Sequence, residues 1–325
     1  MTDARRPVCS VIVCTRDRPD ALDRCLAALG HQDYPSLDVI VVDNAGSDSA
    51  TREIARRHGA RYVFEPDRGL SRARNRGVSV STADVVAFVD DDAVPAPGWL
   101  ASLAREFADS KVSAATGKIV LKAPTDDPAL LAECRAYAER RGDERIVLDR
   151  RHPRWFVLCN FGGIGDGGNM AFRRSDVSLW MGFDVRLGRG ALIDGGEDQH
   201  AFFSLIARGG RMVYTPLAVV EHPTPATSGE LRERRRRDVS NAAAYVTLLC
   251  VEHWEYWPTI AAHLGRWLVR RPVSGTAAAP LVSGGEAMRL RWSGLLLYLR
   301  SRFSRAYEPE VGYRPAVQST ELPGR

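Results

Sequence analysis

Residues 85–92 read VVAFVDDD and place three aspartates directly after five apolar residues. A short apolar run rich in β-branched residues predicts a strand that is buried on both faces. Adjacent carboxylates repel one another unless a cation or hydrogen-bond donors offset their charge. Hard divalent ions such as Mg²⁺ and Mn²⁺ prefer oxygen ligands of this kind, often together with substrate phosphates. The run therefore indicates either a cation site or a solvated acidic turn whose aspartates cap the next segment.

The chain before this stretch alternates between apolar runs and helical patterns. Apolar runs predict strands at residues 8–14, 37–42 and 61–64, in addition to the strand at 85–89. Apolar residues at helical spacing predict helices at 21–29, 49–58 and 70–78. Strands that are apolar throughout, with helices between them, indicate an α/β fold with a mostly parallel central sheet and helices on both faces.

The pattern continues with a helix at 98–108 and a strand at 112–120, and then loosens from residue 123 to about 161. A glycine-dense loop at 161–175 leads into a short strand, followed by a helix at 197–208 and extended chain at 211–220. After Pro223 we expect helices at 239–252, 257–269 and 288–303, a break at 272–285, and disorder over the last twenty residues. These changes predict a domain at 1–225 and a mainly helical C-terminal region at 226–325 with a disordered tail.

The composition is that of a globular protein. Of 325 residues, 45% are apolar and 26% are charged, which excludes a disordered, collagen-like or disulfide-scaffold protein. The net charge is +5, but the sequence lacks zinc-finger spacing and the aromatic and basic motifs of RNA readers, so we expect no nucleic-acid partner. The six cysteines form no C-x-x-C pair, which argues against a zinc site and favours reduced thiols. With neither a signal-like apolar segment nor a run of 18 apolar residues, the expected location is cytoplasmic.

Polar residues follow three of the predicted strands at the point where each ends. Thr15, Arg16 and Asp17 follow the first strand, Asp43 and Asn44 follow the second, and the triple aspartate follows the fourth. In open α/β sheets, ligands bind beyond the carboxyl ends of the strands. We therefore expect all three groups to meet at one edge of the sheet.

Six segments give the chain a family resemblance over about residues 8–222. They are SVIVCTRDRPDALDRCLAAL (10–29), IVVDNAGSD (40–48), GLSRARNRG (69–77), FVDDDAVP (88–95), GGNMAFRR (167–174) and GGED (195–198). In order and spacing these resemble the inverting glycosyltransferases of family 2, in particular bacterial enzymes that use nucleotide sugars. The resemblance implies the GT-A fold and a nucleotide-diphosphate sugar donor, with UDP-sugars favoured and TDP- or GDP-sugars as alternatives.

The resemblance also implies which residues surround the donor. Those residues are Thr15, Arg16, Asp43, Asn44, Arg72, Asn75, Asp90, Asp91, Gly167, Gly168 and Asn169. Thr15 and Arg16 would border the nucleotide pocket, and Asp43 would accept hydrogen bonds from the base. Asp90 and Asp91 would lie near the ribose or the waters of the metal ion. The glycine segment would line the sugar and acceptor pocket, or would be an ordinary connection before a strand.

The same resemblance assigns the metal ligands and the base. Asp92 would bind Mn²⁺ or Mg²⁺ directly and His222 would complete the site, although a histidine after a strand is otherwise structural. Asp198 would remove the proton of the acceptor hydroxyl, and Glu197 would orient the acceptor or be the alternative base. Both open a predicted helix, where the positive end of the dipole favours a carboxylate, so simple N-terminal capping is the other interpretation.

Two other functions remain open from the residues alone: a sugar nucleotidyltransferase, or an inactive carbohydrate-binding or assembly protein on the same fold. The first is disfavoured because the first turn, TRDRPD, lacks a glycine-rich phosphate loop. In the C-terminal region, residues 293–307 (SGLLLYLRSRFSRAY) mix apolar residues with arginines. This pattern fits peripheral contact with an anionic membrane at its inner face, or a helix packed on its own domain or on a homodimer partner. The acceptor is not indicated.

Overall fold

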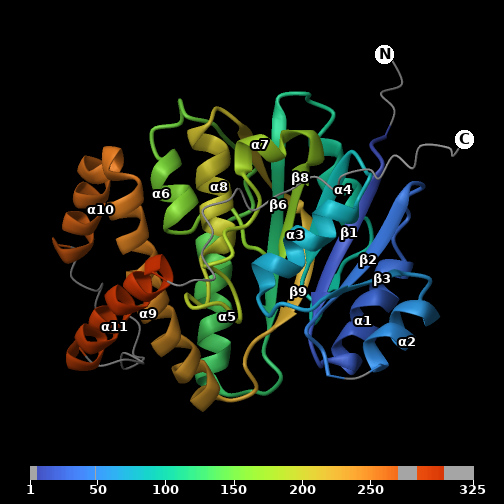
Figure 1. Cartoon of the computed structure of the whole chain (residues 1–325), viewed down its shortest axis with the longest axis horizontal. Helices are drawn as coiled ribbons and strands as arrows, with labels where there is room; N and C mark the ends of the chain where they lie inside the picture. Colours follow the sequence, from blue (N-terminus) through green and yellow to red (C-terminus); the bar gives the residue numbers. More distant parts are fainter. Residues whose placement is uncertain (1–5, 48, 270–283, 304–325) are drawn as a thin grey trace, which may run out of the picture.

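A nine-stranded sheet forms the centre of the computed structural model, which describes residues 6–47, 49–269 and 284–303 (Figure 1). The strand order is β3-β2-β1-β4-β8-β6-β9-β5, and β7 pairs with β9 outside this path. The strands are β1 (Cys9–Thr15), β2 (Leu37–Asn44), β3 (Arg61–Glu65), β4 (Val85–Val89), β5 (Val94–Pro95), β6 (Val112–Lys122), β7 (Ile146–Leu148), β8 (Asn169–Arg173) and β9 (Arg211–Pro223).

The direction of the strands changes at the middle of the sheet. Strands β1 to β4 are parallel, as the apolar runs predict. Strand β8 runs antiparallel to both of its neighbours, β4 and β6, while β9 lies parallel to β6. Short strands β5 and β7 are antiparallel to β9. The α/β class is confirmed, but the sheet is more mixed than the sequence indicates.

Helices cover both faces of the sheet because alternate residues of each strand point to opposite sides. Val11 and Val13 of β1 belong to a core that includes residues of α1 (Pro19–Gly30), α2 (Ala50–Arg57) and α4 (Trp99–Glu106). Ile12, between them, belongs to the second core, with α3 (Leu70–Val80), α6 (Trp155–Asn160), α7 (Val177–Trp180) and α8 (Glu197–Ala207). Strands β1, β2 and β4 are thus covered from both sides, whereas β3, at the edge of the sheet, has only exposed or partly exposed residues.

The C-terminal helices extend the second core. They are α9 (Ser228–Glu252), α10 (Trp257–Val269) and α11 (Gly284–Phe303), and α10 and α11 lie at the end of the molecule away from α1 and α2 (Figure 1). Ala244, Tyr245 and Leu248 of α9 are buried in the same core as α8. The described part of the C-terminal region therefore packs directly on the sheet domain that precedes it.

Most helices and strands lie within two or three residues of their predicted positions. Among the exceptions, α5 (Pro128–Arg141), β7 and α6 fill the region without a clear pattern, and the short elements β5 and α7 are not predicted. Helix α9 begins eleven residues before the predicted position, and α11 begins four residues before its own. The first turns of α9 contain the run RERRRR (232–237), where apolar periodicity is absent and gives no sign of a helix. The start of the helix is marked instead by Thr227, whose side chain caps its N-terminus. The predicted break at 272–285 falls largely outside the described residues, and the predicted disordered tail falls entirely outside them.

Among the described residues, no helix combines the length and the apolar character that a membrane span requires.

Candidate functional site

One edge of the sheet collects the ends of five strands. The carboxyl ends of the parallel strands β1, β2 and β4 lie at this edge, where Thr15 pairs with Asp43. Strand β8 begins there, because Asn169 pairs with Val89, and β9 ends there. The polar residues that follow β1, β2 and β4 in the sequence therefore lie together at this edge of the sheet. Residues from distant parts of the chain lie there as well.

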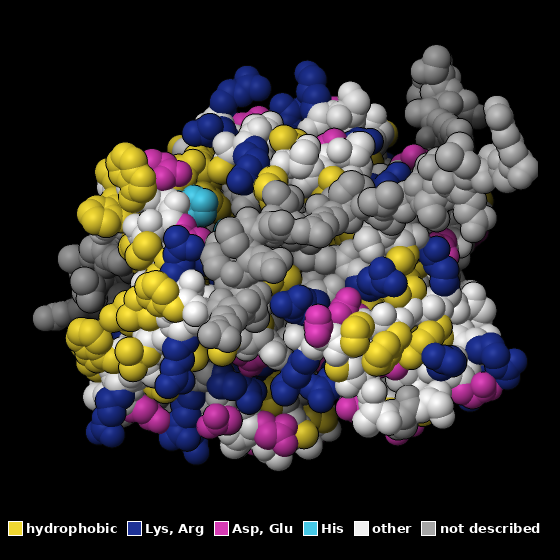
Figure 2. Space-filling model, in the orientation of Figure 1, with side chains coloured by type: hydrophobic (Ala, Val, Ile, Leu, Met, Phe, Trp, Pro, Cys, Tyr) yellow, Lys and Arg dark blue, Asp and Glu magenta, His cyan; other side chains and the backbone are white. Residues whose placement is uncertain are grey.

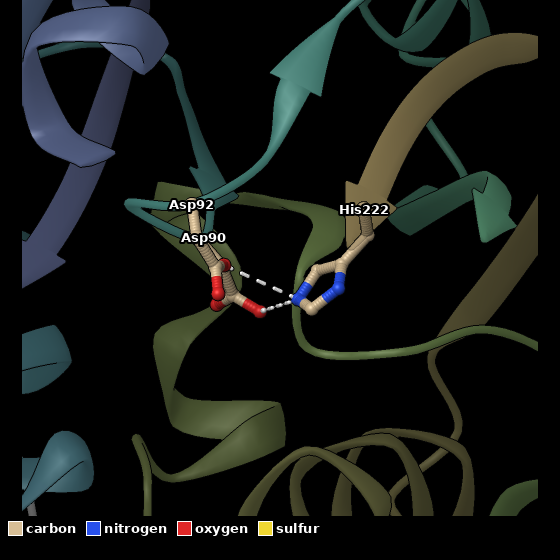
Figure 3. A group of neighbouring side chains, drawn as sticks. All are labelled: Asp90, Asp92 and His222. Carbon is tan, nitrogen blue, oxygen red and sulfur yellow. Dashed lines mark ion pairs between the residues drawn. The ribbon is translucent and has the colours of Figure 1, made fainter. Parts of the chain in front are cut away.

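Asp90, Asp92 and His222 form a compact cluster at this edge (Figure 3). One ligand atom of each side chain lies within 4.8 Å of the others. His222 Nε2 is 3.3 Å from Asp92 Oδ1 and 3.6 Å from Asp90 Oδ2. Burial alone would lower the pKa of His222, but the two carboxylates outweigh burial and raise the pKa to about 9. Two carboxylates and an imidazole suit a divalent ion such as Mn²⁺.

Asp91 does not belong to this cluster and is held by two other side chains. Thr15 Oγ1 donates a hydrogen bond of 2.7 Å to Asp91, and Arg18 forms an ion pair of 2.7 Å with it. Burial raises the pKa of Asp91 to about 6 in spite of Arg18. Arg18 also pairs with Asp92 at 2.7 Å, so it braces two of the three aspartates. The sequence analysis does not select Arg18, although it lies in the same turn, TRDRPD.

Arg74 connects the acidic cluster to the carboxylates at the start of α8. Its guanidinium is buried, 2.8 Å from Glu197 Oε1 and 3.5 Å from Asp90 Oδ1, and it donates to the carbonyl oxygen of Gly167. It also lies over the ring of Phe183, 5.4 Å from the centroid. Burial alone would lower the pKa of Arg74, but the charges of Glu197 and Asp90 outweigh burial and raise the pKa above its usual value. Arg74 therefore keeps its positive charge. Arg72 and Asn75 are predicted from the sequence, whereas Arg74 is not, although its helical spacing from buried Ser71 and Val78 indicates an inward-facing side chain.

Asp198 and Glu197 occupy the first turn of α8 but have different surroundings. Glu197 is buried and its carboxylate is engaged by Arg74. Asp198 is partly exposed and accepts backbone hydrogen bonds from Gly167 and Gln199. Burial, followed by the charges of Glu197 and Asp166, raises the pKa of Asp198 to about 7. Asp198 is thus a carboxyl group that changes its charge near neutral pH.

The glycine segment packs tightly against these side chains. A Cβ on Gly167 would lie 2.9 Å from Arg74 Nη2, and a Cβ on Gly168 would lie 2.6 Å from Asp90 Oδ2. Asn169 is fully buried, and its amide bonds to Trp99 Nε1 and to the carbonyl oxygens of Lys118 and Ala218. The side chain of Asn169 therefore holds β8, β6 and β9 together, while the two glycines allow the backbone to approach the carboxylates.

The end of β2 forms a second polar group. Asp43 is buried and accepts hydrogen bonds from the Tyr62 hydroxyl at 2.8 Å and from the Gly46 amide at 3.1 Å. Asn44 bonds to the Asp67 carbonyl oxygen and to the Gly69 amide, and so fixes the turn that leads into α3. The Tyr62 contact is absent from the sequence analysis because Tyr62 lies on the neighbouring strand β3.

Three other predicted donor residues lie in different settings. Arg16 is exposed and lies 3.6 Å from Asp17, and Arg72 lies 3.8 Å from Asp67. Asn75 forms two hydrogen bonds of 2.8 Å with the backbone of Phe183. The side chain of Asn75 therefore anchors the loop before α8.

That loop, residues 183–196, is also held by α9. Arg186 is buried between Asp184 and Glu252, each 2.6 Å away, and Glu252 accepts a further hydrogen bond from Tyr298 of α11. Asn241 of α9 bonds to the backbone of Asp194. Because the loop ends at Glu197, the C-terminal helices help to position the carboxylates of α8.

Comparisons with known proteins agree with this arrangement. A family model described as Glycosyl transferase family 2 matches residues 10–179. An N-acetylglucosaminyltransferase of Rhizobium leguminosarum bv. viciae is 30% identical over 234 residues, which cover 70% of this chain and 53% of that protein. The succinoglycan biosynthesis protein ExoM of Rhizobium meliloti is 29% identical, with 73% of this chain and 74% of that protein covered. This chain thus spans about half the length of the first relative.

Solved structures share the fold. The mannosyltransferase PcManGT from Pyrobaculum calidifontis, in complex with GDP-Man and Mn²⁺, has a TM-score of 0.56 at 20% identity and covers 92% of this chain and 88% of its own. S. aureus TarS 1–349 in complex with UDP-GlcNAc has a TM-score of 0.57 at 15% identity and covers 90% of this chain and 81% of its own. These likenesses confirm the GT-A fold. Together with the family match over more than half of the sequence, they lead to the conclusion that the chain belongs to glycosyl transferase family 2.

Proposed function

We propose that this protein transfers a sugar, with inversion, from a nucleotide-diphosphate sugar to an acceptor hydroxyl, in a reaction that depends on a divalent metal ion. The observation that supports this most directly is the meeting of two kinds of group at one sheet edge. A metal-binding cluster, Asp90, Asp92 and His222, lies there, and Arg74 connects it to the carboxylates of α8. Transfer with inversion needs both a site for the diphosphate and a base on the opposite side of the sugar.

The donor is proposed to bind along the ends of β1, β2 and β4. Asp43 accepts from Tyr62 and Gly46 and has lone pairs left for a ring N–H of the base. Thr15, Arg16 and Arg72 lie along the same edge and are assigned to the nucleotide pocket. Structural relatives hold GDP-Man or UDP-GlcNAc, which supports a nucleotide sugar here. We propose a UDP-sugar first, with GDP- and TDP-sugars as alternatives.

The metal ion is assigned to Asp90, Asp92 and His222. The sequence resemblance predicts Asp92 and His222 as ligands, and the distances within the cluster support adding Asp90 to them. When bound, a divalent ion neutralises the charge that develops on a departing diphosphate. Arg18 keeps the carboxylate of Asp92 oriented, and Arg74 does the same for Asp90. The Mn²⁺ in the mannosyltransferase complex supports a divalent ion, and Mg²⁺ is the alternative.

Asp198 is assigned as the base that takes the proton of the acceptor hydroxyl. The carboxylate of Glu197 is buried and neutralised by Arg74, which leaves it poorly suited to receive a proton. Asp198 forms no ion pair with the described residues, and its raised pKa gives it a stronger affinity for a proton than an ordinary aspartate has. Glu197 then acts by fixing Arg74, and so Gly167 and Asp90, in place.

The two other candidate functions gain less support. A sugar nucleotidyltransferase would need a phosphate loop, which the turn after β1 lacks, and family membership also argues against it. An inactive binding protein has no use for both a metal cluster and a base. A bacterial source, a cytoplasmic location and a homodimer remain predictions.

The proposed function is tested by measuring donor binding and turnover with and without Mn²⁺. UDP-, GDP- and TDP-sugars are offered to the protein, and thermal stabilisation and hydrolysis of the donor are followed. We expect one nucleotide class to stabilise the protein only when Mn²⁺ or Mg²⁺ is present, and Asp92→Asn to lose this stabilisation while keeping its own unfolding temperature. Full turnover in excess EDTA would remove the metal from the mechanism, and binding of no nucleotide would overturn the proposal.

A further inference from the structure

Helix α11 has two faces with different surroundings. One face, with Gly294, Tyr298 and Ser301, is buried against α9, where a Cβ on Gly294 would lie 2.3 Å from the Ser240 carbonyl oxygen. The opposite face carries large apolar side chains that are exposed to solvent. They are Met288, Trp292, Leu296, Leu299 and Phe303, and between 41% and 81% of each side chain is exposed. Their spacings of four, four, three and four residues place them in a single stripe along the helix.

Arginines border this stripe on both sides. At 3.6 residues per turn, Arg289 and Arg300 lie along one side of it, and Arg291 and Arg302 lie along the other. The single acidic residue of α11, Glu286, is turned toward α9, where it pairs with Arg236 at 2.6 Å. The outward half of α11 therefore carries a continuous apolar strip bordered by arginines, and none of the acidic residues of this helix lies on it.

A second apolar group lies near the stripe at the same end of the molecule. Trp254 lies between α9 and α10, Trp257 is the first residue of α10, and the two are 70% and 59% exposed. Tyr298, on the face of α11 opposite the stripe, donates a hydrogen bond to Glu252, two residues before Trp254, so α11 and the segment that carries the tryptophans are neighbours. Figure 2 shows hydrophobic side chains gathered over α10 and α11 with arginines or lysines beside them. Exposed apolar patches of this kind mark interaction sites.

The geometry points to a docking surface for an anionic lipid bilayer, formed by the stripe of α11 and the two tryptophans. Leucine, tryptophan and phenylalanine side chains enter the boundary between headgroups and acyl chains, and arginines beside them reach the phosphates. Tryptophan prefers this interface. The helix lies flat on the surface rather than crossing it, because α9 covers its other face. This surface is separate from the sheet edge and does not depend on the transfer reaction.

Charge argues against a second copy of the chain as the occupant. A symmetric dimer brings the same surface patch together with itself. Two such stripes face to face would place arginine beside arginine along both borders, and like charges at an interface cost affinity. An anionic surface supplies opposite charge along the border that Arg289 and Arg300 form.

The surface is tested by co-sedimentation of the full-length protein with lipid vesicles. One set of vesicles is phosphatidylcholine alone, and the other contains phosphatidylglycerol in addition. We expect binding to the anionic vesicles that weakens as salt rises. The double variant Trp292→Ser, Leu296→Ser should lower it at least tenfold, and Arg289→Gln with Arg300→Gln should remove the preference for anionic lipid.

Matched controls lie elsewhere on the surface. Leu217→Ser removes an apolar side chain that is 64% exposed on β9, and Arg24→Gln with Arg105→Gln removes two arginines from α1 and α4, so neither should change vesicle binding. Three results would overturn the inference. The first is no vesicle binding by the unchanged protein, or binding that the stripe variants retain. The second is a dimer in light scattering that the stripe variants convert to monomers. The third is a stripe variant that unfolds at lower urea concentration than Leu217→Ser, because this loss of stability would mean that the chain covers its own stripe.

Discussion

Asp198 is a carboxylic acid whose charge depends on pH in the range where enzymes usually work. Burial and the neighbouring charges of Glu197 and Asp166 raise its pKa to about 7. A raised pKa in an acid means that the neutral form persists up to that pH, and the neutral form cannot accept the proton of a hydroxyl. Turnover should therefore rise about tenfold per pH unit below pH 7 and level off above it.

Side-by-side variants separate Asp198 from its neighbour. Asp198→Asn should lower turnover by about 10²–10⁴ and abolish the rise with pH, while the donor dissociation constant hardly changes. Glu197→Gln removes one of the charges that raise the pKa of Asp198, so the rise should remain and move to lower pH. Turnover of both variants is measured from pH 5 to 9 with the true acceptor. If the pH profile stays unchanged in Asp198→Asn, the base is another group.

At the scale of a single element, the start of β8 controls the position of Asp90, which we propose as a metal ligand. A Cβ on Gly168 would lie 2.6 Å from Asp90 Oδ2, and the end of a side chain gives way more easily than backbone does. Gly168→Ala should therefore fold normally but displace the carboxylate of Asp90. We expect Mn²⁺-dependent nucleotide binding to weaken at least tenfold with little change in unfolding temperature. Gly30→Ala, where the Cβ would meet nothing within 4 Å, is the control. Equal affinities in the two variants would mean that Asp90 is not a ligand.

The elements that the sequence predicts well are those with strong local patterns. Apolar strands and amphipathic helices of the first 120 residues need only the periodicity of side chains, and the polar residues that follow them identify the sheet edge. The antiparallel direction of β8 is not predicted, because the sequence of a five-residue strand after a glycine loop does not indicate which strand it pairs with or in which direction. Arg74 and Tyr62 are missed for a related reason: each acts on a residue of another element, and that proximity exists only in the folded chain.

Considered as a whole, the molecule connects its C-terminal helices to its candidate site through one buried charge cluster. Arg186 of the loop before α8 lies between Asp184 and Glu252, and only 6% of its side chain is exposed. Removing one carboxylate from a buried cluster leaves the remaining charges poorly balanced. Glu252→Gln should therefore lower the free energy of unfolding by roughly 1–3 kcal/mol and also reduce turnover, because the loop that positions Glu197 and Asp198 loosens.

Urea unfolding and turnover of the same sample measure both effects. The control is Glu53→Gln, which breaks a solvent-exposed pair with Arg56 on α2 and should leave the urea midpoint and the turnover unchanged. A stable Glu252→Gln with full turnover would show that the helices pack on the loop without positioning the site.

The place of β9 within the sheet has a consequence for synthesis of the protein. Strands β1 to β4 pair only with one another and with β8, so the donor half of the sheet can begin to form while the ribosome is still translating the rest. His222 lies at the far end of β9, which must first insert between β6 and β5. A nascent chain that stops before β9 therefore holds the aspartates without the histidine, and the proposed metal-binding cluster is complete only after residue 222 has been translated.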